Sequence, residues 1–131
     1  MRRANLVGTL AFALGSLGAL PIVSGCRVSE TDVHRWEQTE RGPFKLVAVV
    51  EHDKYAWPLR VEAALSLVRM PPRGGVRQGI RLLTDHFTDD EGVDRPGALV
   101  GLPEDARRHI VNGMAPALIQ QMQAPPPAPS R

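Results

Sequence analysis

The placement of proline constrains the fold most, because several prolines open or end short helical segments. The clearest segment begins at Pro58 and is stopped by Pro71 and Pro72. Proline is tolerated in the first turn of a helix but removes a backbone hydrogen bond from its interior. Between these prolines, apolar residues recur at intervals of three and four: Val61, Ala63, Ala64, Leu65, Leu67 and Val68. This period predicts a helix over residues 59–70, with Ala64 and Leu67 packed inside and Glu62 on the solvent side.

A first helix is predicted shortly after residue 30. Ser29 followed three residues later by Asp32 is typical of a helix start. Val33 and Trp36 lie one turn apart behind it, so Trp36 can reach a core. The basic residue and glycine at 41–42 are expected to end this helix.

Pro43 is well placed to open a second helix. The short run at residues 46–50 contains three valines and also fits a buried strand, since periodicity cannot decide a run this short. The helical segments on either side favour a helix.

Two further helices are predicted downstream. A stripe of apolar residues follows the turn at residues 73–75: Val76, Ile80, Leu83 and Phe87. After a connector at residues 92–102, with a turn at 94–97, Pro103 opens the last helix. Its apolar face comprises Ile110, Val111, Met114, Leu118, Ile119 and Met122. Gly113 and Pro116 predict a kink or break near Ala115. We therefore expect an all-α domain over residues 31–123 with no sheet, followed by a proline-rich, disordered tail over residues 124–131.

Residues 59–67, Leu-Arg-Val-Glu-Ala-Ala-Leu-Ser-Leu, resemble the second helix of a HEAT repeat, with Asp53 upstream in the inter-helix turn. The resemblance covers residues 43–70. It implies a short HEAT- or armadillo-like array of helical hairpins, a class of fold that presents interaction surfaces. Val76-Arg77 echoes the motif, but Gly79 stands where alanine is expected. One good repeat is fewer than the roughly three needed for independent stability, so either the flanking helices act as degenerate repeats or the chain opens a longer array.

The N-terminal residues indicate export. Arg2 and Arg3 precede an apolar run over residues 6–20, which predicts a signal peptide over residues 1–25. Val23-Ser24-Gly25-Cys26 resembles the lipobox of bacterial lipoproteins. The resemblance implies cleavage before Cys26, lipidation of its thiol and a short tether over residues 26–30. Arg27 stands where an aspartate would resemble an inner-membrane retention signal, which favours the periplasmic face of the outer membrane.

Two alternatives to lipidation are less consistent with these residues. An uncleaved anchor needs about 20 strongly apolar residues, whereas residues 4–25 are diluted by glycine, serine, threonine and proline. An ordinary secreted protein would keep Cys26 as a free thiol in an oxidising compartment.

The charge balance excludes one class of partner. The chain has 16 Lys and Arg against 14 Asp and Glu, and two of the basic residues lie in the signal segment. The remainder is balanced at 14 of each, whereas phosphate binding needs a clustered basic excess. We therefore expect no nucleic acid partner. With Cys26 acylated, no thiol remains for a disulfide, a metal or nucleophilic catalysis.

Residues capable of chemistry are scattered. Asp85-His86 supplies a pattern for an acid-oriented base, but no nucleophile motif accompanies it. Residues 51–53, Glu-His-Asp, point apart on a helix and are interpreted as a polar helix end. The acidic residues at 89–94 do not match the spacing of a calcium loop and are interpreted as a solvated loop. We predict no catalytic residue, cofactor, metal or small-molecule substrate.

Tyr55 and Trp57 lie in the turn between two predicted helices. They form either a contact patch for a partner or a staple that holds the turn to the next helix. Together with the anchor and the repeat-like hairpin, they favour a membrane-anchored scaffold that binds another protein. The alternative is an envelope enzyme or metal-binding accessory protein that uses histidine and acidic side chains.

Overall fold

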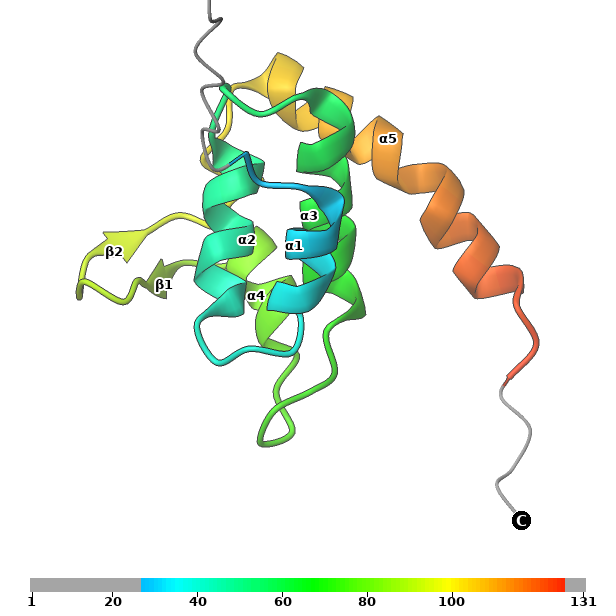
Figure 1. Ribbon diagram of the computed structural model, residues 1–131, viewed down its shortest axis with the longest axis horizontal. Coiled ribbons are helices and arrows are strands. Elements are labelled where there is room, and N and C mark those ends of the chain that lie inside the picture. Colours follow the sequence, from blue (N-terminus) through cyan, green and yellow to red (C-terminus); the bar gives the residue numbers. More distant parts are fainter. Residues whose placement is uncertain (1–26, 127–131) are drawn as a thin grey trace, which may run out of the picture.

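The computed structural model describes residues 27–126 and shows a mainly helical chain with one small hairpin (Figure 1). The elements are α1 (Glu30–Trp36), α2 (Gly42–Glu51), α3 (Trp57–Arg69), α4 (Gln78–Thr84), β1 (Phe87–Thr88), β2 (Asp94–Arg95) and α5 (Glu104–Gln123). The prediction of an all-α fold is confirmed in its main feature, but the expected absence of a sheet is wrong at β1 and β2. The predicted signal peptide, Cys26 and residues 127–131 lie outside the described residues.

α1 begins at the predicted capping arrangement. The hydroxyl of Ser29 accepts a hydrogen bond from the backbone N–H of Asp32 at 3.3 Å. In return, Asp32 Oδ2 accepts one from the backbone N–H of Ser29 at 2.9 Å. The backbone N–H of Ser29, and then its hydroxyl, which also donates to Asp32 Oδ2 at 2.8 Å, lower the pKa of Asp32 below its ordinary value because both bonds favour the ionised carboxylate. Behind the cap, Val33 is buried and Trp36 is partly buried against the core.

The predicted end of this first helix at Gly42 is wrong. α1 ends at Trp36, and Gly42 is instead the first residue of α2, followed by Pro43 in the first turn. A Cβ at position 42 would lie 1.6 Å from the carbonyl oxygen of Trp36. Glycine is therefore required by the close approach of two backbone segments rather than by a helix C-terminus.

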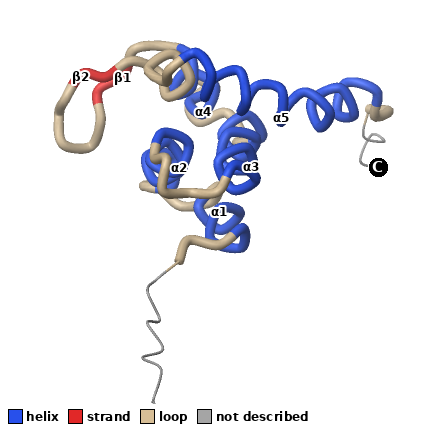
Figure 2. The backbone as a smooth tube through the Cα atoms, turned by 90° about the horizontal axis from the view of Figure 1, so that it is seen from above, coloured by secondary structure: helices blue, strands red, loops and turns tan. Residues whose placement is uncertain are grey.

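α2 and α3 form an antiparallel hairpin at the centre of the molecule (Figures 1 and 2). The ambiguous run at residues 46–50 is helical, as its neighbours predicted. The two helices bury a shared set of side chains: Leu46, Val47, Val49, Val50, Ala63, Ala64, Leu65 and Leu67. The alanines let the helices approach closely and the larger residues fill the space around them.

The buried side chain of Arg60 on α3 binds the end of α2. It is 3% exposed, and its Nε donates to the carbonyl oxygen of Val50 at 2.9 Å. Its Nη2 donates to the carbonyl of Glu51 at 3.5 Å. The last carbonyls of a helix lack partners within it, so the guanidinium satisfies the end of α2. Burial lowers the pKa of Arg60, while the charge of Asp53 opposes the shift.

α4 packs against α3 through a glycine. A Cβ at Gly79 would lie 1.9 Å from the carbonyl oxygen of Leu67, so the alanine of the repeat pattern does not fit here. The predicted apolar stripe is wrong at both ends: Val76 precedes α4 and is exposed, and Phe87 lies on β1. Leu83, within the helix, is buried as expected.

The β1–β2 hairpin contains the acidic run. Phe87 pairs with Arg95 and Thr88 with Asp94, so the predicted turn at residues 94–97 begins inside a strand. Asp89 Oδ1 accepts hydrogen bonds from the backbone N–H groups of residues 91 and 93 at 3.0 and 2.8 Å. This carboxylate therefore organises the loop of the hairpin.

α5 is one uninterrupted helix, so of the predicted kink or break near Ala115 the break is wrong. Pro116 lies inside it. Proline removes the hydrogen bond to the carbonyl four residues earlier, and the residue there, Asn112, is exposed, so water can reach that carbonyl. The first half of α5 contacts α3 through the buried Ile110 and Met114. The second half extends away from the other helices (Figures 1 and 2).

Candidate functional site

The predicted aromatic pair lines a groove between the α2–α3 turn and the start of α5. We call it the Trp57 groove; its volume is about 730 Å³. Its lining is Glu51, His52, Asp53, Lys54, Tyr55, Ala56, Trp57, Arg60, Leu102, Pro103, Asp105 and Ala106. The structure therefore brings Tyr55 and Trp57 to one surface together with the polar end of α2.

Trp57 links two helices while staying accessible. Its ring stacks on the imidazole of His109 in α5 with a centroid distance of 4.3 Å, and the guanidinium of Arg60 lies 4.4 Å from the ring centroid. The Trp57 side chain is nevertheless 38% exposed. Tyr55 is half-buried against the core. Trp57 thus staples α3 to α5 and also offers an apolar edge to a ligand or partner.

One residue that lines the Trp57 groove, Glu51, is a partly desolvated carboxylate. Burial raises the pKa of Glu51, and the charge of Arg95 opposes this shift. Arg95 Nη2 donates to Glu51 Oε2 at 2.6 Å, which ties the end of α2 to the β hairpin. The groove carries both signs of charge and so does not select an anion or a cation by charge alone.

The second half of α5 has a different character. Leu118 is partly buried, Ile119 is 54% exposed and Met122 is 86% exposed. On a helix these three side chains fall on one side, which we call the α5 stripe. Large apolar side chains are rarely left accessible in a row without a contact to make.

A third group of residues lies where α1 meets α3. Glu30 and His34 are one turn apart on α1, and Glu62 comes from α3; their ligand atoms all lie within 4.8 Å of one another. Glu62 also accepts a hydrogen bond from Arg69 at 2.9 Å. The prediction that Glu62 faces solvent is therefore wrong, because its side chain is only 20% exposed.

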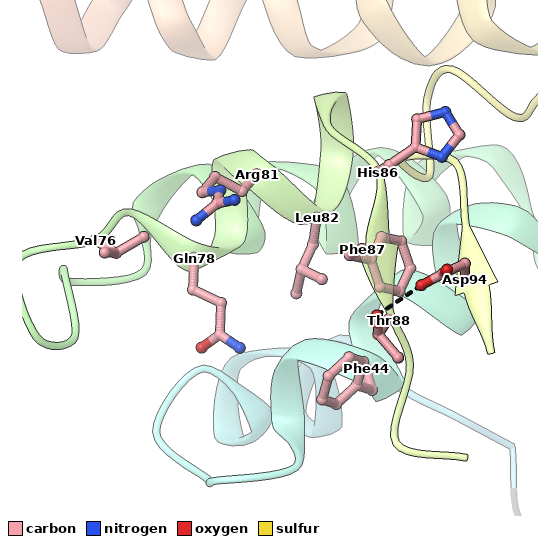
Figure 3. Close-up of a pocket in the computed structure, with 9 residues that line it drawn as sticks. All are labelled: Phe44, Val76, Gln78, Arg81, Leu82, His86, Phe87, Thr88 and Asp94. Atoms are coloured by element: carbon pink, nitrogen blue, oxygen red, sulfur yellow. Dashed lines mark hydrogen bonds between the residues drawn. The ribbon is translucent and has the colours of Figure 1, made fainter. Parts of the chain in front are cut away.

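The histidine that was considered as a possible base lies elsewhere. His86 lines a pocket of about 510 Å³ between α4, the β hairpin and Phe44 (Figure 3). Asp85, its sequence neighbour, instead contacts Arg81 at 3.4 Å and accepts from Thr84 Oγ1 at 2.9 Å. The hydrogen bond drawn in Figure 3 runs from Thr88 Oγ1 to Asp94 and belongs to the hairpin. The pattern of an acid-oriented base is not assembled around His86.

Comparisons with known proteins add no family. No protein-family model matches this chain, and neither the curated proteins nor the solved structures yield a significant match. Between residues 27 and 126, no helix is both long and apolar enough to cross a membrane.

Sequence reasoning missed the α1–α3 cluster. The four-residue spacing of Glu30 and His34 was a usable signal, since such residues neighbour each other on a helix. The proximity of Glu62 could not be predicted from the sequence, because it depends on how α1 and α3 pack together. The α5 stripe was contained in the predicted apolar face, but its exposure follows only from the arrangement of the helices.

Proposed function

We propose that this chain is a membrane-anchored lipoprotein of the cell envelope that acts as a helical scaffold for another protein. The anchor would be lipidated Cys26, as the motif at residues 23–26 implies. Several acyl chains hold a protein firmly where one chain alone is marginal. The periplasmic face of the outer membrane is the proposed location, on the basis of Arg27.

The helical hairpin supports a HEAT-like arrangement. α2 and α3 pack closely through small residues, and α3 also contacts α1, α4 and α5. In helical arrays each pair buries its apolar face on its neighbours, and terminal helices leave one face free. The flanking helices α1, α4 and α5 would serve as degenerate repeat elements around this pair.

The observation that carries the scaffold function is the α5 stripe. The first half of α5 is packed against α3, whereas Ile119 and Met122 extend beyond the body with their side chains accessible. Apolar side chains at adjacent helical turns fit the helix-in-groove mode of recognition, in which a partner supplies an apolar groove. The proposed partner is therefore an envelope protein with such a groove, and the Trp57 groove is a secondary contact.

Site-specific photocrosslinking in intact envelopes tests this surface. A photoreactive residue at Ile119 or Met122 should give a single adduct of fixed mass, and the same residue at Gln120 should not, because Gln120 lies on the opposite side of α5. A double change of Ile119→Asp and Met122→Asp should abolish an adduct formed from a nearby position, whereas Gln120→Asp should leave it. Adducts from Trp57 but none from the α5 stripe would move the contact surface to the groove.

Lipidation has its own test. Wild-type chain should fractionate with membranes and carry a diacylglyceryl mass at an N-terminal Cys26, and Cys26→Ala should lose both the modification and the processing. An unmodified mature N-terminus at another residue would remove the anchor from the proposal. It would leave the α5 stripe as a contact surface of an exported protein.

A further inference from the structure

We propose that Glu30, His34 and Glu62 form a binding site for a divalent transition-metal ion, with Zn²⁺ as the preferred occupant. The site is separate from the α5 stripe and does not depend on the lipid anchor. It joins the first helix of the domain to the central helix, α3, which lie side by side in both views (Figures 1 and 2).

The distances match the requirements of one small ion. His34 Nε2 lies 3.5 Å from Glu62 Oε1 and 3.7 Å from Glu30 Oε1. Two ligand atoms bound at about 2.1 Å in a tetrahedron are roughly 3.4 Å apart. The two distances from His34 are therefore close to this spacing, and the two carboxylate oxygens lie within 4.8 Å of each other, so side-chain rotations can bring all three atoms onto one ion.

The chemistry of the donors indicates the type of metal. One imidazole and two carboxylates supply three protein ligands and leave a fourth position for water or another ligand, as in open zinc sites. An imidazole favours zinc over magnesium and calcium, which prefer all-oxygen sites with more ligands.

The other nitrogen of the imidazole is held by a carboxylate. Glu37 Oε1 lies 3.3 Å from His34 Nδ1, and the fully buried Ser66 donates its hydroxyl hydrogen to the same carboxylate oxygen at 2.6 Å. A proton on Nδ1 shared with Glu37 leaves the lone pair of Nε2 directed at Glu30 and Glu62. Metal-binding histidines commonly have such a carboxylate partner, which fixes the tautomer and the orientation of the ring.

Arg69 opposes metal binding. Its Nη2 donates to Glu62 Oε1 at 2.9 Å, the oxygen that faces His34. Removing this cation should free the ligand oxygen and increase the local negative charge. The proposal therefore predicts that removing Arg69 strengthens binding.

Titration of the full-length, chelator-treated chain with ZnCl₂ by isothermal calorimetry tests the site. Wild type should bind one Zn²⁺ per chain, and His34→Ala or Glu62→Gln should weaken binding roughly tenfold or more. Glu37→Gln, which touches no metal, should weaken it by about 10–100-fold through loss of ring orientation. Arg69→Gln should tighten it several-fold.

His86→Ala is the matched control, because His86 is also exposed and has an acidic sequence neighbour but lies outside the cluster. It should bind like wild type. Circular dichroism identifies any variant that has lost its helices. If His34→Ala fails to fold, the near-isosteric Glu62→Gln tests the site in its place. Absence of saturable binding by wild type overturns the proposal. So does binding that His34→Ala and Glu62→Gln leave unchanged, or that Arg69→Gln leaves unchanged or weakens.

Discussion

α2 and α5 are built from similar apolar side chains but use them in opposite ways. α2 buries six of its ten residues, whereas α5 buries two of its twenty. Stability depends on apolar area removed from water, so α2 and its partner α3 hold the domain together. The second half of α5 contributes little to that core and remains available for a contact outside the chain.

The largest expected difference between the two regions is at Leu67 and Met122. Leu67 is fully buried, and Leu67→Ala should lower the free energy of unfolding by about 2–5 kcal/mol because it leaves a cavity. Met122 is 86% exposed, and Met122→Ala should change the free energy of unfolding by no more than about 0.5 kcal/mol. Urea unfolding of both variants checks the comparison. Equal losses would mean that the second half of α5 is also part of the core.

Gly79 and Gly113, which each lie in a helix that contacts α3, offer a finer comparison. A Cβ at Gly79 would meet the backbone of α3, which cannot move aside, so Gly79→Ala should cost about 1–3 kcal/mol. A Cβ at Gly113 would meet Cγ2 of Val61 at 2.7 Å, a side-chain methyl rather than backbone. The gain in helix propensity of about 1 kcal/mol should offset part of this crowding, so Gly113→Ala should cost less than Gly79→Ala. Thermal unfolding of the pair measures this difference, and a Gly113→Ala loss as large as that at Gly79 would show that α5 is rigidly seated on α3.

The same contrast separates two glutamates. Glu62 is 20% exposed and bonded to Arg69, whereas Glu104, in the first turn of α5, is 69% exposed beside Arg108. Glu62→Ala should cost about 1 kcal/mol because it leaves Arg69 without its partner. Glu104→Ala should cost less than about 0.5 kcal/mol. Measurement of unfolding in the presence of a chelator separates this effect from metal binding. Equal costs for the two variants would mean that Glu62 behaves as a solvent-exposed residue, as its sequence position suggests.

Local patterns predicted most of the helices, because their signals lie within a few residues. The Ser29–Asp32 cap, Pro43 and the stripe at residues 59–70 each act over one or two turns, and the structure has helices at all three. The errors occur where contact with another backbone segment determines the local structure. Gly42 and Gly79 are fixed by approaches to Trp36 and Leu67, which no local pattern contains.

The candidate sites divide in the same way. Tyr55 and Trp57 were identifiable from their place in a turn, but the stacking of Trp57 on His109 required the position of α5. Phe87 was predicted to lie on a helix because of its spacing from other apolar residues, but it lies in β1, where it contacts Phe44. Tertiary packing overrode the periodicity of a short segment there.

The smallest effects concern two carboxylates whose pKa values shift in opposite directions. Asp32 has a lowered pKa because the folded state hydrogen-bonds its ionised form, so its stabilisation is fully present above the ordinary value near 3.8 and is lost as the pH falls through the lowered value. Glu51 has a raised pKa because burial disfavours its charge, so its contribution is most favourable at low pH and declines as the pH rises through the raised value. The penalty of Asp32→Asn relative to wild type should therefore grow between pH 3 and pH 6, and that of Glu51→Gln should shrink over the same interval. Urea unfolding at several pH values measures both slopes. Parallel slopes would mean that the contact of Arg95 with Glu51 outweighs desolvation, and that the end of α2 is as well solvated as the cap of α1.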